Sequence, residues 1–130
     1  MKPDVDGWLD LSSAAMTTLE CEAILQTLSQ EEKGRVRRLF LNNNQLDSVP
    51  DSVKLLTNMD TLRLWANHIE QLPDWLGSLT VLEYLGVSNN LLREIPRSIG
   101  NLKNLKTFFL NKNRISSLPS SLVKLTKLRG

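Results

Sequence analysis

The sequence has little cysteine, few aromatic residues and no long hydrophobic run. Its 130 residues include one cysteine, three tryptophans, one tyrosine and three phenylalanines. A single cysteine excludes a disulfide framework, and no Asn-x-Ser/Thr glycosylation site occurs, so we expect a reducing, cytoplasmic environment. No apolar run approaches the roughly 18 residues of a membrane span, and no apolar stretch follows residues 1–4, so we expect no signal peptide. We therefore expect no membrane association.

The residues that enzymes and metal sites require are also scarce. The one histidine, His68, has no second histidine or cysteine at ligand spacing and is expected to be solvated. Cys21 lies on an apolar face and is expected to be a buried thiol rather than a nucleophile. There is no glycine-rich phosphate loop, and Asp10 is the only carboxylate expected in the central positions of the strands' outer face, so acid–base chemistry lacks a paired carboxylate. The sequence predicts a protein that is not an enzyme and has no cofactor and no metal site.

Charge is unevenly distributed, although the formal net charge is only +2. Residues 1–32 contain seven acidic residues and one basic residue, a net charge of −6. No acidic residue follows Glu94, after which come eight basic residues: Arg97, Lys103, Lys106, Lys112, Arg114, Lys124, Lys127 and Arg129. This distribution can steer an acidic partner toward the C-terminal end. We expect no nucleic-acid partner, because only one aromatic ring, that of Phe109, accompanies these basic residues on the outer face of the predicted strands.

Leucine, in contrast, is abundant, with 26 of the 130 residues, and it follows a repeat. The apolar, asparagine and proline positions of residues 36–50 recur three times, and the first positions of the four units are 36, 59, 82 and 105. The period is therefore 23 residues without a shift. The sequence predicts four repeats and the start of a fifth over residues 36–128, after a different segment at residues 1–35.

Each repeat carries the pattern of a short strand and a turn. In Leu39-x-Leu41 the apolar residues alternate, which is typical of a strand with one buried face. Strands of successive units are expected to lie side by side in the same direction, as a parallel sheet. The asparagine after each strand can bond the backbone of its own and the adjacent unit. This predicts a structural ladder of Asn44, Asn67, Asn90 and Asn113. A proline then turns the chain, and short 3₁₀ or single-turn returns fit the few remaining residues.

These residues resemble the leucine-rich repeat family, specifically its short, 23-residue intracellular class of the Ras-suppressor-like type. The best match is residues 95–105, with an Ile-Pro step followed by Ile99-Gly100-x-Leu102-x-x-Leu105. The resemblance covers residues 36–128 and implies an α/β solenoid. In such a solenoid a curved parallel sheet forms the concave face and short 3₁₀ or helical returns form the convex face. The resemblance also implies that the concave sheet binds other proteins.

The first 35 residues are predicted to form an N-terminal capping repeat. Leu9-x-Leu11 fits the strand pattern, with Ala14 in place of the asparagine. The return segment is seven residues longer than in the other units, and Gly34 is its expected helix C-cap. One face of this predicted amphipathic helix carries four apolar residues: Cys21, Ile24, Leu25 and Leu28.

No polar terminal unit follows Leu110 at the other end of the array. A repeat array needs a polar last unit to cover its core, and an uncovered strand edge can pair with another strand. The missing polar unit therefore has two possible explanations. Either the chain is part of a longer array, or this edge associates with another chain, including a second copy.

Five of the seven aromatic residues fall between or beside the inward leucines, where the core cannot use them. Rings with arginines among them match the composition of binding hot spots. The predicted partner-binding residues are Trp8, Arg38, Phe40, Arg63, Trp65, Tyr84, Phe109 and Lys112. The alternative is that the rings only fill the inside of the curve. Gly86 beside Tyr84 can leave a notch in this surface, whereas Trp75 is expected on the convex side.

The sequence therefore predicts a non-catalytic interaction module, a scaffold in signalling, that binds a protein partner on its concave sheet. The alternative is a structural role. In that case the chain is the N-terminal segment of a longer leucine-rich repeat protein, and binding or signalling is carried out by missing repeats or another domain.

Overall fold

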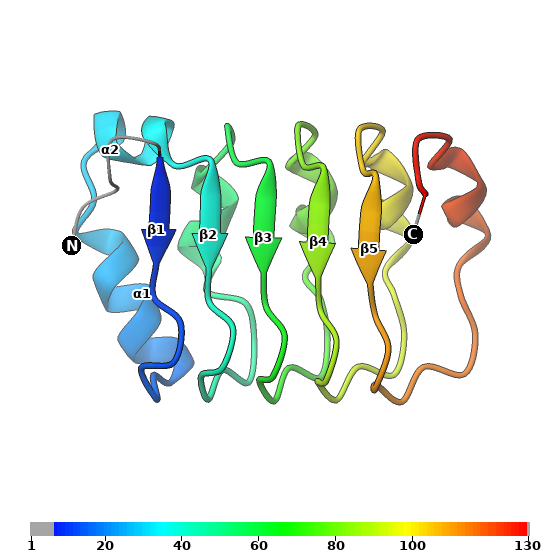
Figure 1. Cartoon of the computed structure of the whole chain (residues 1–130), viewed down its shortest axis with the longest axis horizontal. Helices are drawn as coiled ribbons and strands as arrows, with labels where there is room; N and C mark the ends of the chain where they lie inside the picture. Colours follow the sequence, from blue (N-terminus) through cyan, green and yellow to red (C-terminus); the bar gives the residue numbers. More distant parts are fainter. Residues whose placement is uncertain (1–6, 130) are drawn as a thin grey trace.

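Five parallel strands form one sheet in the computed structural model, which describes residues 7–129. Each strand pairs with the next one along the chain, with Leu39 opposite both Leu9 and Leu62. Figure 1 shows the strands side by side and pointing the same way. The strands are β1 (Trp8–Asp10), β2 (Arg38–Phe40), β3 (Thr61–Arg63), β4 (Tyr84–Gly86) and β5 (Thr107–Phe109). The predicted parallel sheet is confirmed.

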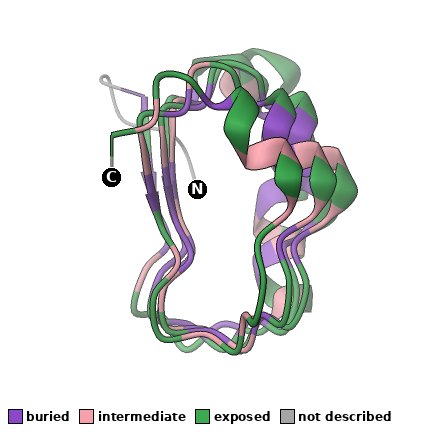
Figure 2. Cartoon of the chain, turned by 90° about the vertical axis from the view of Figure 1, so that its right-hand side faces the viewer, coloured by how far each residue is buried: buried purple, intermediate pink, exposed green. Residues whose placement is uncertain are grey.

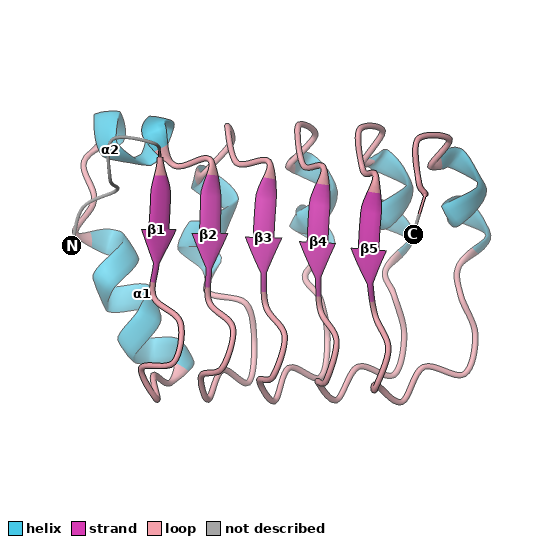
Figure 3. Cartoon of the chain, viewed as in Figure 1, coloured by secondary structure: helices cyan, strands magenta, loops and turns pink. Residues whose placement is uncertain are grey.

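Short helical return segments lie on the opposite side of the molecule from the sheet, so that each coil has a strand on one side and a helical turn on the other (Figures 2 and 3). A proline precedes each 3₁₀ segment, and its restricted φ directs the chain into the turn. The segments are η1 (Asp51–Leu55), η2 (Asp74–Ser78), η3 (Arg97–Asn101) and η4 (Ser120–Lys124). The predicted 3₁₀ returns are also confirmed.

The glycine of the return allows successive 3₁₀ segments to approach closely. A Cβ atom added to Gly77 would lie 2.5 Å from the Ser98 carbonyl oxygen of the next coil. At Gly100 it would lie 2.8 Å from the Cβ atom of Ser121. Both distances are shorter than van der Waals contact, so a larger residue would push neighbouring coils apart.

The core fills the space between the sheet and the returns. Leu39, Leu62 and Leu85 occupy the same strand position in three coils, and each is 0% exposed. Complete burial of one such side chain stabilises the fold by about 1.5–3 kcal/mol. The buried residues form one cluster that extends from Leu9 to Leu125. Stacked leucine columns therefore hold the coils together and place the other strand positions on the outside.

The Asn ladder joins neighbouring coils through the backbone. The Asn67 Nδ2 group donates to the carbonyl oxygens of Leu41 and Leu64 at 3.1 and 3.0 Å. Its Oδ1 atom accepts from the Leu46 N–H at 3.0 Å. The corresponding amide in the other three coils makes equivalent bonds: Asn44, Asn90 and Asn113. These bonds satisfy buried backbone groups that no regular secondary structure pairs.

The first coil differs from the prediction in its helices. Two helices are present, α1 (Thr18–Gln26) and α2 (Gln30–Arg35). The predicted apolar face is observed on α1 and just after it, and its three buried members are Cys21, Leu25 and Leu28. Helix α1 packs against η1 and takes the place of a 3₁₀ return in this coil.

The predicted C-cap at Gly34 is wrong, because that residue lies inside α2. Helix α1 ends at Gln26, and the Thr27 hydroxyl donates to the Ile24 carbonyl oxygen at 2.6 Å. Ser29 then forms a reciprocal capping box with Glu32, which starts a new helix. The polar residues at 27 and 29 therefore divide the segment before the glycine is reached.

Candidate functional site

The outward side of the five strands, here called the sheet face, carries the predicted contact residues. These positions alternate with the buried leucines and point away from the core. The register places Trp8, Arg38, Thr61, Tyr84 and Thr107 in one row across the sheet. A second row contains Asp10, Phe40, Arg63, Gly86 and Phe109.

Rings and guanidinium groups contact one another in the first half of the sheet face. The rings of Trp8 and Phe40 meet edge to face, with centroids 5.5 Å apart. The Arg63 guanidinium carbon lies 4.0 Å above the centroid of Phe40 and 5.3 Å from that of Trp65. Arg38 lies over Trp8 at 4.9 Å. These cation–π contacts hold both arginines against the sheet.

The contacts continue into the second half through Gly86. A Cβ atom on Gly86 would lie 2.8 Å from the Trp65 ring and 3.3 Å from the Tyr84 ring. The notch that Gly86 leaves is therefore occupied by the Trp65 ring. Tyr84 in turn meets Phe109 edge to face, with centroids 5.8 Å apart. We call the connected set the aromatic strip: Trp8, Phe40, Arg63, Trp65, Tyr84 and Phe109.

Members of the aromatic strip differ in accessibility. Trp8 is 39% exposed and Phe109 46% exposed, while Trp65 and Tyr84 are half-buried. Phe40 is only 5% exposed, although it lies on the sheet face. Its ring contacts Trp8 and is covered by the Arg63 guanidinium. Phe40 therefore supports its neighbours and offers little of its own ring at the surface.

A small hollow opens in the sheet face beside these residues. Its volume is about 260 Å³, and it is lined by Trp8, Arg38, Phe40, Thr61, Arg63 and Tyr84. Sites for drug-sized molecules occupy roughly 300–1,000 Å³. The hollow is therefore suited to one side chain rather than to a cofactor.

One carboxylate, Asp10, lies at the margin of the sheet face. The Ser12 hydroxyl and backbone N–H donate to its Oδ1 atom at 2.6 and 2.9 Å. These hydrogen bonds hold the pKa of Asp10 below its ordinary value, with a smaller contribution from the charge of Arg63 and an opposing one from partial burial. Asp10 is therefore an ionised hydrogen-bond acceptor and not a proton donor.

Lys112 lies apart from the aromatic strip, in the turn after β5. Its side chain is exposed, and its backbone φ is 57°. No ring contact or ion pair joins it to the strip among residues 7–129. The structure thus brings seven of the eight predicted contact residues together and leaves Lys112 at the edge.

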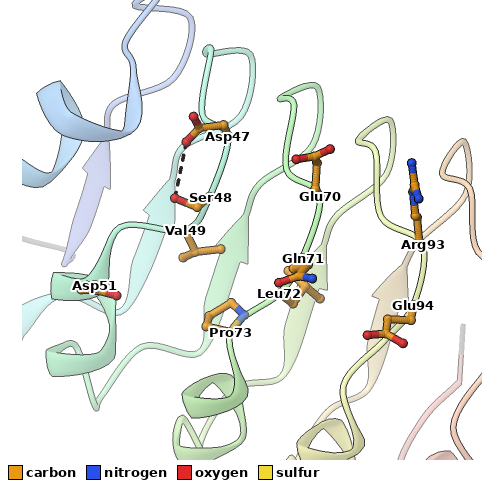
Figure 4. A pocket seen from close by; sticks show the side chains of 10 residues that line it. All are labelled: Asp47, Ser48, Val49, Asp51, Glu70, Gln71, Leu72, Pro73, Arg93 and Glu94. Carbon is orange, nitrogen blue, oxygen red and sulfur yellow. Dashed lines mark hydrogen bonds between the residues drawn. The ribbon is translucent and has the colours of Figure 1, made fainter.

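The sequence did not indicate a larger groove of about 820 Å³ that lies between successive coils, outside the sheet face (Figure 4). Figure 4 shows Asp47, Glu70 and Arg93 on three adjacent turns. The charged lining consists of Asp47, Asp51, Glu70, Arg93 and Glu94. The sequence did contain a pattern that could have indicated this groove, because the acidic residues at positions 47 and 70 are one period apart. Within residues 7–129, no group of three or more His, Cys, Asp or Glu side chains is arranged to hold a metal ion.

Three other residues singled out in the sequence, Cys21, Trp75 and His68, lie outside the aromatic strip. Cys21 is buried, and burial together with the nearby charge of Glu22 raises the pKa of its thiol to about 12. A thiol with this pKa is not an effective nucleophile. Trp75 is half-buried and packs against the core from η2, and His68 is exposed. No helix in the described part of the chain is both long and apolar enough to cross a membrane.

Comparisons with known proteins agree with this architecture. A family profile described as a leucine-rich repeat region matches residues 74–129. A leucine-rich repeat protein of Leptospira interrogans is 30% identical, with a TM-score of 0.67 over 78% of this chain and 27% of that chain. No curated protein sequence matches the chain.

A second similar structure is the leucine-rich repeat ectodomain of the plant membrane receptor kinase GASSHO1/SCHENGEN3 from Arabidopsis thaliana, in complex with CASPARIAN STRIP INTEGRITY FACTOR 2. It is 27% identical, with a TM-score of 0.65, and the match covers 74% of this chain and 12% of that chain. The chain therefore spans only a small part of the length of either structure. Neither match tests the Ras-suppressor-like class, which stays a prediction.

Proposed function

Because this chain is a leucine-rich repeat protein, we propose that it is a non-catalytic interaction module whose sheet face binds a protein partner. The observation that carries the proposal is the aromatic strip, which connects all five strands and exposes Trp8 and Phe109. Aromatic residues and arginine dominate the binding energy of protein interfaces. A continuous strip of these residues on an outer surface is therefore suited to a protein partner.

The scaffold beneath the strip favours binding without a change of shape. Parallel pairing and the Asn ladder hold each strand in register with its neighbours. A preorganised surface loses less conformational entropy on association than a mobile loop does. The structurally similar Arabidopsis ectodomain was solved in complex with CASPARIAN STRIP INTEGRITY FACTOR 2, which further supports a binding role for this chain. A scaffold role in signalling and a cytoplasmic location belong to the proposal, the location because Cys21 is a free thiol.

The test is a pull-down from cell lysate with the wild-type chain and a Trp65→Ala/Phe109→Ala variant. We expect a protein that the wild type retains to be lost by the variant, since truncation of a hot-spot ring costs about 2 kcal/mol or more. Mass spectrometry identifies and quantifies the retained protein. Circular dichroism establishes that the variant is folded.

Val123→Ala is the matched control, because Val123 is 83% exposed on η4, away from the sheet face. It removes exposed apolar surface without touching the strip. Equal recovery by the wild type and by the double variant would contradict binding on the sheet face.

A second candidate function is structural, as one segment of a longer solenoid. The last coil supports it, because Leu118 is 53% exposed, whereas Ile95 in the preceding coil is 4% exposed. The Leu92 N–H donates to a ladder amide, Asn113, but within residues 7–129 the Ile115 N–H has no such acceptor. A further coil, or a second copy at the edge of β5, would cover these groups.

Multi-angle light scattering over a concentration series separates these two explanations. Association through β5 predicts a mass that rises with concentration in the wild type and stays at 14.7 kDa in a Leu118→Lys variant. A constant 14.7 kDa mass in the wild type contradicts self-association. If the sheet-face variant also keeps its partner in the pull-down, the structural role is favoured.

A further inference from the structure

We propose that the hollow between Arg38 and Arg63 receives an acidic side chain, an aspartate or glutamate, of the protein partner. This inference rests on the proposed function and names the chemical group that the sheet face recognises. It concerns the 260 Å³ hollow in the sheet face and not the larger, 820 Å³ groove between the coils. Three observations support it: the size of the hollow, the contacts that hold the two arginines, and the absence, among the described residues, of an ion pair for either arginine together with the unpaired Nε–H of Arg63.

The hollow matches one side chain in size and in kind. Its lining combines two guanidinium groups with three aromatic rings and the Thr61 side chain. The aromatic rings beside the guanidinium groups reduce the contact of these charges with water. The attraction between a guanidinium and a carboxylate strengthens as water is excluded. An acidic side chain offers a carboxylate for the arginines and methylene groups for the rings.

Contacts with aromatic rings position both arginines. Arg38 lies 4.9 Å from the centroid of Trp8, and Arg63 lies 4.0 Å from that of Phe40. A planar guanidinium that packs with its face on a ring keeps its N–H donors at the edge, in the geometry that a carboxylate accepts. Because these ring contacts already restrict the arginine side chains, less side-chain entropy is lost when a carboxylate binds.

Neither arginine has a carboxylate partner within the part of the chain that the structure describes. The two ion pairs there join Arg35 to Glu31 and Lys106 to Glu83. The Nε atom of Arg63 is buried and has no hydrogen-bond partner. A buried donor without a partner is rare in folded proteins.

Neither Asp10, which lies close enough to sense the charge of Arg63, nor Asp60, which precedes Thr61, lines the hollow. Asp10 accepts two hydrogen bonds from Ser12, and Asp60 accepts the Thr61 hydroxyl at 2.7 Å. Two cations, of which Arg63 has a buried Nε–H without a partner, therefore line a recess that no acid of the described residues lines. Charge complementarity assigns an acidic group of the partner to this place.

A random dodecapeptide library displayed on phage supplies the probe. Peptides are selected on the full chain, resynthesised with acetyl and amide ends, and tested against the wild type and an Arg38→Gln/Arg63→Gln variant. We expect the selected peptides to share an acidic residue next to an apolar one. Replacement of that residue by its amide, or the double variant, should weaken binding about tenfold or more.

Arg97→Gln is the matched control, because Arg97 lies on η3 and outside the sheet face. It should leave the affinity unchanged. The ¹⁵N signal of the Arg63 Nε–H gives a second measurement that does not depend on a substitution. It should shift when the acidic peptide is added to the wild type and stay in place when the amide analogue is added.

Different outcomes separate this inference from the proposed function. Peptides without an acidic residue that bind the arginine variant normally but lose affinity for Trp65→Ala/Phe109→Ala would overturn the inference and leave the function intact. Peptides that bind every variant equally would overturn both.

Discussion

Residues at equivalent positions of successive coils share a backbone conformation but not a side chain. The residue before each ladder asparagine has a φ near +57° in every repeat, and those of the four regular repeats are Asn43, Ala66, Asn89 and Lys112. Asparagine adopts this left-handed conformation comparatively easily, whereas alanine does not. Ala66 is therefore a point of backbone strain in the third coil.

Replacement of Ala66 by glycine should raise the free energy of unfolding by about 0.5–1 kcal/mol. The left-handed conformation costs an L-residue roughly 1–2 kcal/mol, of which part is offset by the greater entropy of glycine in the unfolded chain. Urea unfolding measures the change. Ala23→Gly in α1 is the control with the opposite sign, a loss of about 1 kcal/mol. A lower stability of Ala66→Gly would show that this position carries no strain.

A second row of asparagines, on the return side, is interrupted by Val81. Asn58 donates to the Gly34 carbonyl oxygen at 2.8 Å, and Asn104 donates to the Thr80 carbonyl oxygen at 2.9 Å. Val81 holds the equivalent position between them and is 42% exposed.

Val81→Asn should therefore raise the free energy of unfolding by about 1 kcal/mol, because the new amide can donate to the carbonyl oxygen of Thr57. Thermal and urea unfolding provide the measurement. Val81→Asp has a similar shape without the amide donor and should show no gain. Equal stabilities of the two variants would argue against a new hydrogen bond.

At the level of elements, the start of α1 depends on a reciprocal capping box. The Thr17 backbone N–H donates to the Glu20 carboxylate at 3.0 Å, and the Glu20 backbone N–H donates to the Thr17 hydroxyl oxygen at 3.3 Å. The backbone hydrogen bond from Thr17, followed by the one from its hydroxyl, lowers the pKa of Glu20 from its ordinary value of 4.5. Helix stability is thereby linked to pH.

Glu20→Gln should make the stability less dependent on pH in acid. A carboxylate whose pKa is lower in the folded state stabilises that state above its unfolded pKa, near 4.5, and loses this effect as the pH falls through the folded value. Glutamine retains the capping geometry but does not titrate. Urea midpoints between pH 7 and pH 3 compare the two proteins. An unchanged slope for Glu20→Gln would contradict the link.

At the scale of the whole molecule, stability is expected to fall toward the C-terminal end. Each coil of a repeat protein contacts only its neighbours. The interior coils bury Leu62 and Leu85 completely, while Leu118 and Val123 in the last one are 53% and 83% exposed. The last coil therefore gains burial from one side only.

Hydrogen exchange should show this gradient directly. The amides of Leu64 and Val87, which bond to Gly86 and Phe109, should exchange through global unfolding. The amides of Leu122 and Leu125, in the last return, should exchange at least about tenfold faster, because that coil can open alone. Mass spectrometry or NMR measures the rates. Uniform protection from residue 36 to residue 128 would mean that the array unfolds as one unit.

The repeat and its sheet could be predicted because they depend on local patterns that recur. Leu39-x-Leu41 specifies a one-sided strand, and the 23-residue period places Asn67 one coil beyond Asn44. Once the period is known, the neighbours of each strand follow from arithmetic. The side of the sheet on which Trp65 and Phe109 lie follows from the same alternation.

Tertiary structure alone decided which of those outward residues a partner can reach. Phe40 and Phe109 occupy the same row, but Phe40 is covered by Arg63 and Phe109 is 46% exposed. Trp65 fills the notch at Gly86 because its ring turns toward the next strand. A periodic pattern specifies where each Cα atom lies, whereas accessibility depends on side-chain conformations and on contacts one coil away in the chain.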